Sequence, residues 1–491
     1  MARALSVIAD QAFSRAAGAP LIDGNAVRVL RDARENYPAW MSAIQSARKW
    51  IHFESYIIHD DQSGCDFARA LMERARAGVH VRVVYDWLGA VSATTWMFWE
   101  RMRRAGIEVR AFNQPRLDAP LGWMARDHRK MLGVDGQVGF ITGLCVGDMW
   151  AGGGRYAGLE PWRDTGVEIR GPAVPHIEQA FADVWAATGK PLPEDELLPD
   201  GAVPNTGNTA LRVIASKPAT AGMFRLDQLV AAVARKTLWI TDAYFVGASP
   251  YVQALVAAAD DDVDVRLLVP GGSDLPLLQP LTRAGYRQLL EAGVRIFEWN
   301  GSMVHAKTAV ADSRWARVGS SNLNIQSWLG NWELDVAIED DEIGRQMEQM
   351  YLEDLERATE IVLSARSVRR VTGASSHSAR PRHRPRWSHR TGRTRRAATA
   401  GALRLGRTFR AALTARRQLG AAEVWSLIYG MLLLGAIGFV GLKWPRGLAY
   451  PLGIFSIWIA ISLLIQAAKL WGKRAAAVPE TKPAGRREDA A

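Results

Sequence analysis

The chain has 491 residues, of which 48% are hydrophobic and 23% charged, and its formal net charge is +11. That length exceeds what one ordinary hydrophobic core supports, so we expect two or more globular units. The charge is uneven: residues 366–420 contain 16 Arg and no acidic residue, and residues 421–491 add +4. The first 365 residues are therefore acidic, at about −9, which argues against a nucleic-acid partner for the body of the protein.

The cysteines and the N-terminal residues bear on the cellular compartment. Cys65 and Cys145 are too few for a disulfide framework, and their spacing suits no zinc site. Asp10 and Arg15 interrupt the N-terminal sequence early, so we expect no signal peptide. A reducing, cytoplasmic setting fits these features.

Two segments of the chain share one order of predicted elements. The first has a strand at 50–56, a helical stretch, a strand at 79–84 and a helix ending at Ala105-Gly106. The second has the same order, with strands at 238–244 and 263–268 and a helix ending at Ala292-Gly293. A Gly ends each helix and a β-branched run begins the next strand. The matched order predicts a duplicated α/β unit with helices covering a sheet; two unrelated α/β domains are the alternative.

The composition changes after residue 364. Residues 366–420 cannot bury enough apolar surface to fold alone, and we expect a solvated linker or, at 403–419, a basic helix on a membrane surface. Residues 424–442 and 448–468 carry no charge, and each run is long enough to span a bilayer core of about 30 Å. We expect a transmembrane helical hairpin with both ends in the cytoplasm, because basic residues flank it on both sides. A buried hairpin in a soluble domain is the alternative.

These observations divide the chain into six parts. They are an N-terminal extension (1–24), a first α/β unit (25–200), a second α/β unit (201–365), an Arg-rich linker (366–420), two transmembrane helices (421–472) and a polar tail (473–491).

One motif, H-x-K-x-x-x-x-D, occurs at corresponding places in both halves. Its residues are His128, Lys130 and Asp135, and then His305, Lys307 and Asp312. A His and a Lys two positions apart on a strand point to the same face. A neutral imidazole can attack phosphorus, and an adjacent ammonium can hold a phosphate oxygen. We include each Asp in the predicted catalytic site as a motif member, although its spacing favours a structural role.

Polar residues after each of the two motifs extend the predicted site. Ser320 and Asn322 lie in a run of small residues and can donate hydrogen bonds to phosphate oxygens, so we predict substrate contacts for both. Glu333 offers a carboxylate that would fix the tautomer of an imidazole, and we predict the same orienting role for Asp164.

With these motifs in place, residues 25–364 resemble the phospholipase D superfamily and, within it, the bacterial cardiolipin synthases. The repeated motif carries the likeness to the superfamily. The likeness to cardiolipin synthases rests on Glu54-Ser55-Tyr56, Gly143-Leu144, Trp162-Arg163-Asp164 and residues 315–323. The resemblance implies two duplicated phospholipase D-like α/β units packed around a shared active site, with no metal or cofactor. It implies His128 as nucleophile and His305 as general acid and base.

Two features depart from that family's pattern. Cys145 occupies a place where the family has Asn, and we interpret it as a small buried hydrophobe. The apolar hairpin follows the catalytic halves, whereas in the family membrane spans usually precede them.

The leading functional hypothesis is a phosphatidyltransferase that makes cardiolipin or a similar phospholipid through a phosphohistidine intermediate. Phosphatidylglycerol is the expected substrate, and the bacterial inner membrane is the expected location, with the catalytic units in the cytoplasm. The closest alternative is a phospholipase D that hydrolyses phospholipid to phosphatidate. A nuclease of the superfamily disagrees with the acidic body, and an inactive membrane scaffold has no need of two complete motifs.

Overall fold

The computed structural model describes residues 2–115, 125–275 and 278–363, together with a few positions between 439 and 461. The predicted Arg-rich linker and nearly all of the two apolar runs lie outside the described residues. Within the described part of the chain, no helix is both long enough and apolar enough to cross a membrane.

The strands of the two units follow one another in the same spatial order. In the first unit the order is β1-β7-β6-β5-β2-β3-β4, and in the second it is β8-β14-β13-β12-β9-β10-β11-β15. The first unit contains β1 (Ile22–Arg31), β2 (Trp50–Ser55), β3 (His80–Asp86), β4 (Glu108–Phe112), β5 (Lys130–Val134), β6 (Val138–Thr142) and β7 (Thr165–Arg170). The second contains β8 (Thr209–Ser216), β9 (Thr237–Thr241), β10 (Asp264–Pro270), β11 (Arg295–Trp299), β12 (Thr308–Ala311), β13 (Trp315–Gly319), β14 (Glu333–Glu339) and β15 (Ala358–Ile361). The predicted duplication is confirmed.

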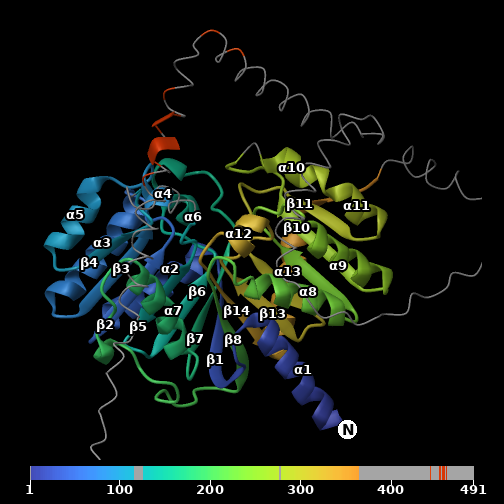
Figure 1. The fold of residues 1–491 in the computed structure, drawn as a ribbon, viewed down its shortest axis with the longest axis horizontal. Coiled ribbons are helices and arrows are strands. Elements are labelled where there is room, and N and C mark those ends of the chain that lie inside the picture. The colour runs from blue at the N-terminus through green and yellow to red at the C-terminus, as the bar shows by residue number, and fades with distance from the viewer. Residues whose placement is uncertain are drawn as a thin grey trace, which may run out of the picture.

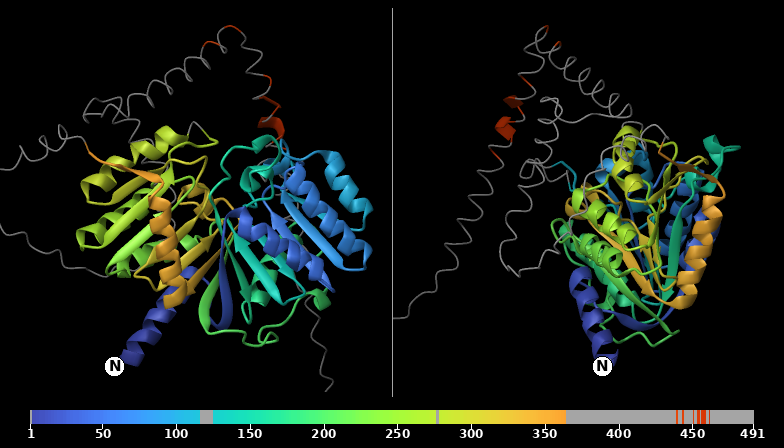
Figure 2. Two further views of the ribbon diagram at one scale, coloured as in Figure 1. Left: turned by 180° about the vertical axis from the view of Figure 1, so that it is seen from behind. Right: turned by 90° about the vertical axis from the view of Figure 1, so that its right-hand side faces the viewer.

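The strands of both units form one continuous sheet through the pair of β1 and β8, and helices pack on both of its faces (Figures 1 and 2). The first unit and the N-terminus contribute α1 (Ala2–Ala17), α2 (Asp32–Ser46), α3 (Gln62–Arg76), α4 (Trp87–Ala90), α5 (Trp96–Arg104), α6 (Asp148–Ala151) and α7 (Val174–Ala187). The second contributes α8 (Gly222–Val233), α9 (Ser249–Asp260), α10 (Leu278–Ala284), α11 (Tyr286–Glu291), α12 (Ile325–Leu329) and α13 (Asp341–Leu355). Gly106 and Gly293 have φ angles of 94° and 90°, the left-handed conformation that ends a helix, as the sequence predicts.

Three hydrophobic cores hold these layers together. One lies under α2, α3 and α5, and a second lies under α8, α9 and α11. The third contains residues of both sheets together with α7 and α13, and it joins the two units. In Figure 1 α7 faces the viewer, and in the left view of Figure 2 the orange α13 does. The two units therefore share a core rather than meeting through a surface contact.

The segment assigned as an N-terminal extension contains a helix that packs on the second unit. The guanidinium of Arg225 in α8 donates to the carbonyl oxygen of Ala16 (3.1 Å), and Arg212 of β8 pairs with Asp10. β1 begins at Ile22 and makes an antiparallel pair with β8, with a shift of register between Ile22 and Asn25. The first strand therefore begins inside the segment that the sequence assigned to the extension.

Strand direction places both motifs at one end of the sheets. β2 and β3 are parallel, as are β9 and β10, so their carboxyl ends share an edge with the histidine motifs. β5 runs antiparallel to β2 and pairs Lys130 with Ser55, the last residue of β2. We call this edge the active-site end of the protein.

Candidate active site

His128 lies just before β5 and is held by residues of the second unit. Its Nδ1 atom is 2.9 Å from Oε2 of Glu333, the first residue of β14. Its backbone N–H donates to the carbonyl oxygen of Trp332 (2.9 Å), and the N–H of Trp332 donates to the carbonyl oxygen of Arg126 (2.8 Å). The second unit therefore positions both the ring and the backbone of the first histidine.

His305 is held in the same way by the first unit. Its Nδ1 atom is 2.7 Å from Oδ2 of Asp164. Its backbone N–H donates to the carbonyl oxygen of Arg163 (2.7 Å), and the N–H of Arg163 donates to the carbonyl oxygen of Met303 (2.9 Å). The two predicted orienting carboxylates thus bind histidines of the opposite unit, in a reciprocal arrangement.

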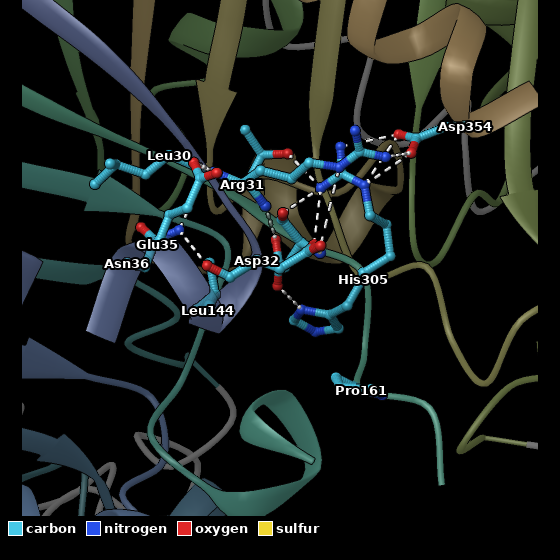
Figure 3. A network of polar contacts seen from close by, with 12 residues as sticks. Leu30, Arg31, Asp32, Glu35, Asn36, Leu144, Pro161, His305 and Asp354 are labelled. Carbon is cyan, nitrogen blue, oxygen red and sulfur yellow. Dashed lines mark hydrogen bonds and ion pairs between the residues drawn. The ribbon is translucent and has the colours of Figure 1, made fainter. Parts of the chain in front are cut away.

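A buried ionic network fixes the segment that carries Asp164 (Figure 3). The guanidinium of Arg163 donates to both carboxylate oxygens of Asp354 in α13 (2.9 and 3.1 Å) and to Oδ1 of Asp32 (3.1 Å). The same oxygen of Asp32 accepts the N–H of Asp164 (2.9 Å). Because Asp32 and Asp354 come from different units, the network joins the units behind His305.

The two motif lysines are buried beside their own histidines. Lys307 Nζ lies 3.0 Å from each ring nitrogen of His305, and each lysine donates to the backbone oxygen of the histidine in its own motif. Burial lowers the pKa of Lys307 to about 8; Asp164 opposes this shift and Lys130 adds to it. Lys130 and Lys307 come from different units, yet their positive charges lie close enough to act on each other.

Both histidines are neutral at pH 7. Burial lowers the pKa of His305 to about 3, with Lys307 adding to the effect and Asp164 opposing it. Burial also lowers the pKa of His128, although Glu333 opposes it. A carboxylate can only accept a hydrogen bond, so each Nδ1 carries the proton and each Nε2 presents a lone pair. That is the form an imidazole needs to act as a nucleophile or general base.

The orienting carboxylates are ionised despite complete burial. Burial alone would raise the pKa of Asp164, but His305 and Lys307 outweigh it, and the pKa lies below its ordinary value. The pKa of Glu333 is also below its ordinary value, because His128 outweighs the effect of burial. Each carboxylate can therefore stabilise an imidazolium when one forms.

Two tyrosines that the sequence analysis did not assign to the site face the motifs. The ring centroid of Tyr56 is 5.0 Å from that of His128, and the ring centroid of Tyr244 is 5.8 Å from that of His305. Each ring also lies near its motif lysine, with Nζ to centroid distances of 5.2 Å for Lys130 and 5.7 Å for Lys307. The two tyrosines occupy corresponding positions after β2 and β9. A comparison of the two halves of the sequence could therefore have pointed to them.

His305 has two further aromatic neighbours. The ring centroids of Trp150 and Trp162 lie 5.6 and 5.5 Å from its own. The indole N–H of Trp150 also donates to Oδ2 of Asp164 (3.3 Å). Trp150 lies in α6 and Trp162 in the loop before β7. The corresponding connection of the second unit, between β13 and β14, is shorter, so comparison of the two halves does not point to these tryptophans.

The structure assigns Ser320 a different role from the predicted phosphate contact. Its hydroxyl donates to Oε2 of Glu333 (2.6 Å) and accepts the N–H of Leu334 (2.9 Å). A serine has one hydroxyl proton, so this arrangement leaves none for a phosphate oxygen. Asn322 is buried, and its carboxamide oxygen has no hydrogen-bond partner among the described residues, so this side chain remains a candidate contact.

The corresponding loop of the first unit is built differently. A Cβ atom on Gly143, at the position of Ser320, would collide with Oδ1 of Asp164, so the glycine makes room for the shorter carboxylate. Cys145, at the position of Asn322, is 2% exposed and belongs to the core of the first unit. Its burial agrees with our interpretation of this residue as a small hydrophobe.

Asp135 and Asp312, which we included among the catalytic residues, lie away from the histidines. Asp135 follows β5 and accepts the backbone N–H groups of residues 48, 49 and 50 at 2.8 to 2.9 Å. Asp312 follows β12 and accepts those of residues 235, 236 and 237 at 2.7 to 3.0 Å. A strand rises about 3.3 Å per residue, so each carboxylate caps a turn at the far end of its strand. Their catalytic assignment was wrong, and their role is structural.

The fold and site together define a class: a duplicated α/β protein in which two His–Lys motifs share one site equipped for phosphoryl transfer. A sequence profile described as "Cardiolipin synthase, PLD-like domain" matches residues 40–147 and 230–355. The chain is 31% identical over 351 residues to a cardiolipin synthase of Alkalihalophilus pseudofirmus, covering 70% of this chain and 69% of that protein. It is 34% identical over 352 residues to cardiolipin synthase A of Pseudomonas putida, covering 70% and 71%. The chain therefore belongs to the cardiolipin synthase family of phospholipase D-like proteins.

A solved structure shares the fold. The phosphatidylserine synthase of Haemophilus influenzae superposes with a TM-score of 0.58 at 13% identity, covering 72% of this chain and 91% of that protein. At this level of identity the likeness concerns the fold alone.

Proposed function

We propose that this chain transfers a phosphatidyl group between phospholipids, making cardiolipin or a similar lipid through a covalent phosphohistidine. Relatives named cardiolipin synthase, matching over 70% of the chain, support the reaction class. The observation that carries the mechanism is the pair of neutral histidines, each bound to an ionised carboxylate of the opposite unit. Phosphatidylglycerol is the proposed substrate.

In the first half-reaction, Nε2 of His128 attacks phosphorus. A phosphorus–nitrogen bond forms as the phosphorus–oxygen bond to the departing alcohol breaks, and His305 gives that oxygen a proton. The pKa of His305 is low in the protein alone, but the negative charge of a bound phosphodiester raises it and favours the protonated form. We assign the nucleophile to the first motif from the resemblance to the superfamily, because the two histidines have nearly symmetrical surroundings.

In the second half-reaction, His305 takes the proton of the acceptor hydroxyl. The acceptor oxygen attacks phosphorus, the phosphorus–nitrogen bond breaks, and His128 returns to its neutral form. Glu333 stabilises the positive charge that His128 carries in the intermediate. Lys130 and Lys307 hold the non-bridging oxygens, whose negative charge needs a counterion in a buried site.

The products distinguish transfer from hydrolysis. The purified protein is incubated with vesicles of phosphatidylglycerol, and the lipids are identified by mass spectrometry. Cardiolipin together with glycerol indicates transfer to a second lipid. Phosphatidate in place of cardiolipin indicates that water is the acceptor, and it would contradict the proposed function while leaving the phosphohistidine mechanism intact.

For the C-terminal part, the proposal is a transmembrane hairpin that anchors the protein in the bacterial inner membrane, with the catalytic units in the cytoplasm. Two uncharged runs at 424–442 and 448–468, with basic residues on both flanks, support it. Anionic lipid attracts each Arg near the surface by about 1 kcal/mol, so residues 366–420 would lie against the leaflet.

Truncation after residue 364 tests the anchor. We expect a protein that keeps its activity on detergent-dispersed lipid and loses most of it on intact vesicles. Full-rate turnover of vesicles by the truncated protein would show that the anchor has no part in substrate access. A folded but inactive truncated protein would show that the tail belongs to the site.

A further inference from the structure

Exposed apolar side chains gather at one end of the catalytic body. Among the described residues up to 363, eleven large hydrophobic side chains are exposed, and eight of them lie at the active-site end. The eight are Leu88, Val91, Trp96, Met97, Leu159, Leu275, Ile325 and Leu329. In Figure 1 the elements that carry or adjoin them, α4, α5, α6, α10 and α12, are grouped away from α1 and the N-terminus.

Strand direction explains why these residues surround the site. β3 ends at Asp86, whose carboxylate accepts the N–H of Asp127 (2.9 Å), the residue before His128. α4 begins at the next residue, so Leu88 and Val91 follow directly. In the second unit, Tyr244 contacts His305 and its hydroxyl donates to Asp274 (2.9 Å), the neighbour of Leu275.

The most exposed of the eight begin α5. Trp96 and Met97 are 69% and 71% exposed, and with Leu88 and Val91 they form what we call the α4–α5 patch. Beside it lies a cavity of about 570 Å³, lined by Trp96 and Met97 and by three arginines, Arg76, Arg101 and Arg104. Apolar and aromatic tips beside cationic groups are typical of surfaces that meet phospholipid headgroups.

Two carboxylates also line this cavity, and both have partners within the protein. Asp60 accepts a hydrogen bond from the Thr95 hydroxyl, and Glu100 accepts one from Nε of Arg104 (3.1 Å). Arg76 and Arg101 are exposed, and neither forms an ion pair with a carboxylate within the part of the chain that the structure describes. Three arginines outnumber the two carboxylates in this lining, so its formal net charge is +1, although the first 365 residues as a whole are acidic.

The opposite end has a different surface. Of the three remaining exposed hydrophobics, Val233 and Val362 lie at or near that end and Leu352 lies within α13. Val233 ends α8 beside the turn that Asp312 caps, and it is 47% exposed. Exposed apolar side chains are therefore concentrated around the active site and are not spread evenly over the described surface.

We infer that the active-site end rests on the surface of an anionic phospholipid bilayer, with the α4–α5 patch inserted among the headgroups. This inference rests on the proposed function, because the reacting phosphodiester of a bilayer lipid lies at headgroup depth. Side chains from both units surround the site, as contact with a plane requires, whereas a peptide partner would need one continuous groove. Insertion by about 5–10 Å is usual for such surfaces.

Fluorescence quenching by brominated lipid tests the contact without any turnover. Met97→Cys in a Cys65→Ala background carries an environment-sensitive fluorophore on the full-length protein, and Lys307→Met keeps the lipid composition constant. Vesicles contain phosphatidylglycerol with bromine atoms near the start of the acyl chains. The matched control is the same fluorophore at Val233→Cys, which is exposed at the far end.

We expect quenching at position 97 and none at position 233. Absence of quenching at 97, or equal quenching at both positions, would overturn the inference. Shielding of the fluorophore at 97 without vesicles, growing with protein concentration, would show that a second copy of the chain covers the patch and would also overturn it. Because no product is measured, these outcomes are independent of whether the proposed reaction is correct.

An activity measurement gives a second readout in the otherwise unchanged protein. The double variant Trp96→Ser/Met97→Ser should raise KM for vesicles by roughly 100-fold, about tenfold for each large apolar side chain that no longer enters the bilayer. Turnover of detergent-dispersed lipid should remain unchanged, and Val233→Ser should change neither value. An equal loss on both forms of lipid would show that the patch supports the fold instead.

Discussion

Oε2 of Glu333 lies 2.9 Å from Nδ1 of His128, although the two residues belong to different units and are 205 positions apart in the chain. Asp164 and His305 make the reverse connection at 2.7 Å. Each unit therefore supplies a histidine that only the other unit can orient. A single unit would contain one motif but not a complete site.

Replacing Glu333 with Gln should slow turnover by roughly 100-fold or more, because the amide cannot stabilise an imidazolium and permits the wrong tautomer. The amide keeps the size of the side chain and can still accept from Asn331, so the fold should persist. Turnover is measured on vesicles, and folding is checked by thermal unfolding. A fully active Glu333→Gln variant would remove the carboxylate from the mechanism.

Lys307→Met should reduce turnover roughly 100- to 1,000-fold in a protein that still folds. The ammonium is buried in the site, and methionine fills a similar volume without a charge. Initial rates on dispersed and vesicular lipid provide the measurement. Near-normal rates in a folded variant would exclude Lys307 as a ligand of the phosphoryl oxygens.

The pH dependence should show an alkaline limb set by Lys307. Its pKa is lowered to about 8, so the ammonium loses its proton, and the site its charge, as pH rises through that value. We expect kcat/KM to fall above about pH 8, where Lys307 no longer holds a phosphoryl oxygen with a full positive charge. Arginine keeps its charge at high pH, so Lys307→Arg should shift the alkaline fall of kcat/KM to higher pH. If the fall stays at the same pH, another group causes it.

Removal of either motif aspartate should affect stability rather than chemistry. Asp312→Ala leaves three backbone N–H groups without their acceptor and should lower the free energy of unfolding by about 1–3 kcal/mol. Asp312→Asn is the matched control, because asparagine still accepts a hydrogen bond and tolerates the positive φ of 52° at this position. Thermal unfolding measures the loss, and turnover per folded molecule should stay the same.

Gly143→Ser should impair the enzyme through Asp164. The new side chain would occupy the space of Oδ1 of Asp164 and displace the carboxylate from His305. Cys145→Ser, two residues away, should be mild by comparison, because Cys145 packs in the core. Equal losses in the two variants, measured as turnover of vesicles, would show that the loop as a whole is sensitive and that the space for Asp164 is not the cause.

Local patterns in the sequence determined the duplicated α/β order, the helix ends at Gly106 and Gly293, and the two His–Lys pairs. Each of these depends on residues a few positions apart, whose relative geometry follows from the repeat of a strand or the end of a helix. The carboxylates Glu333 and Asp164 could be picked out by residue type and by likeness to a family. Their partners could not, because no local spacing relates residues more than 140 positions apart.

Only the tertiary structure decided which groups meet. In the folded protein the hydroxyl of Ser320 binds Glu333 instead of facing the substrate. Tyr56 and Trp150 lie beside the histidines, and Asp135 lies at the opposite end of its strand. The physical reason is that the site forms where the two units meet, and the order and direction of the strands decide which side chains reach that place. The spacing of residues within one strand shows which side chains lie on the same face. Which residues those side chains contact depends on how the other unit packs against the strand.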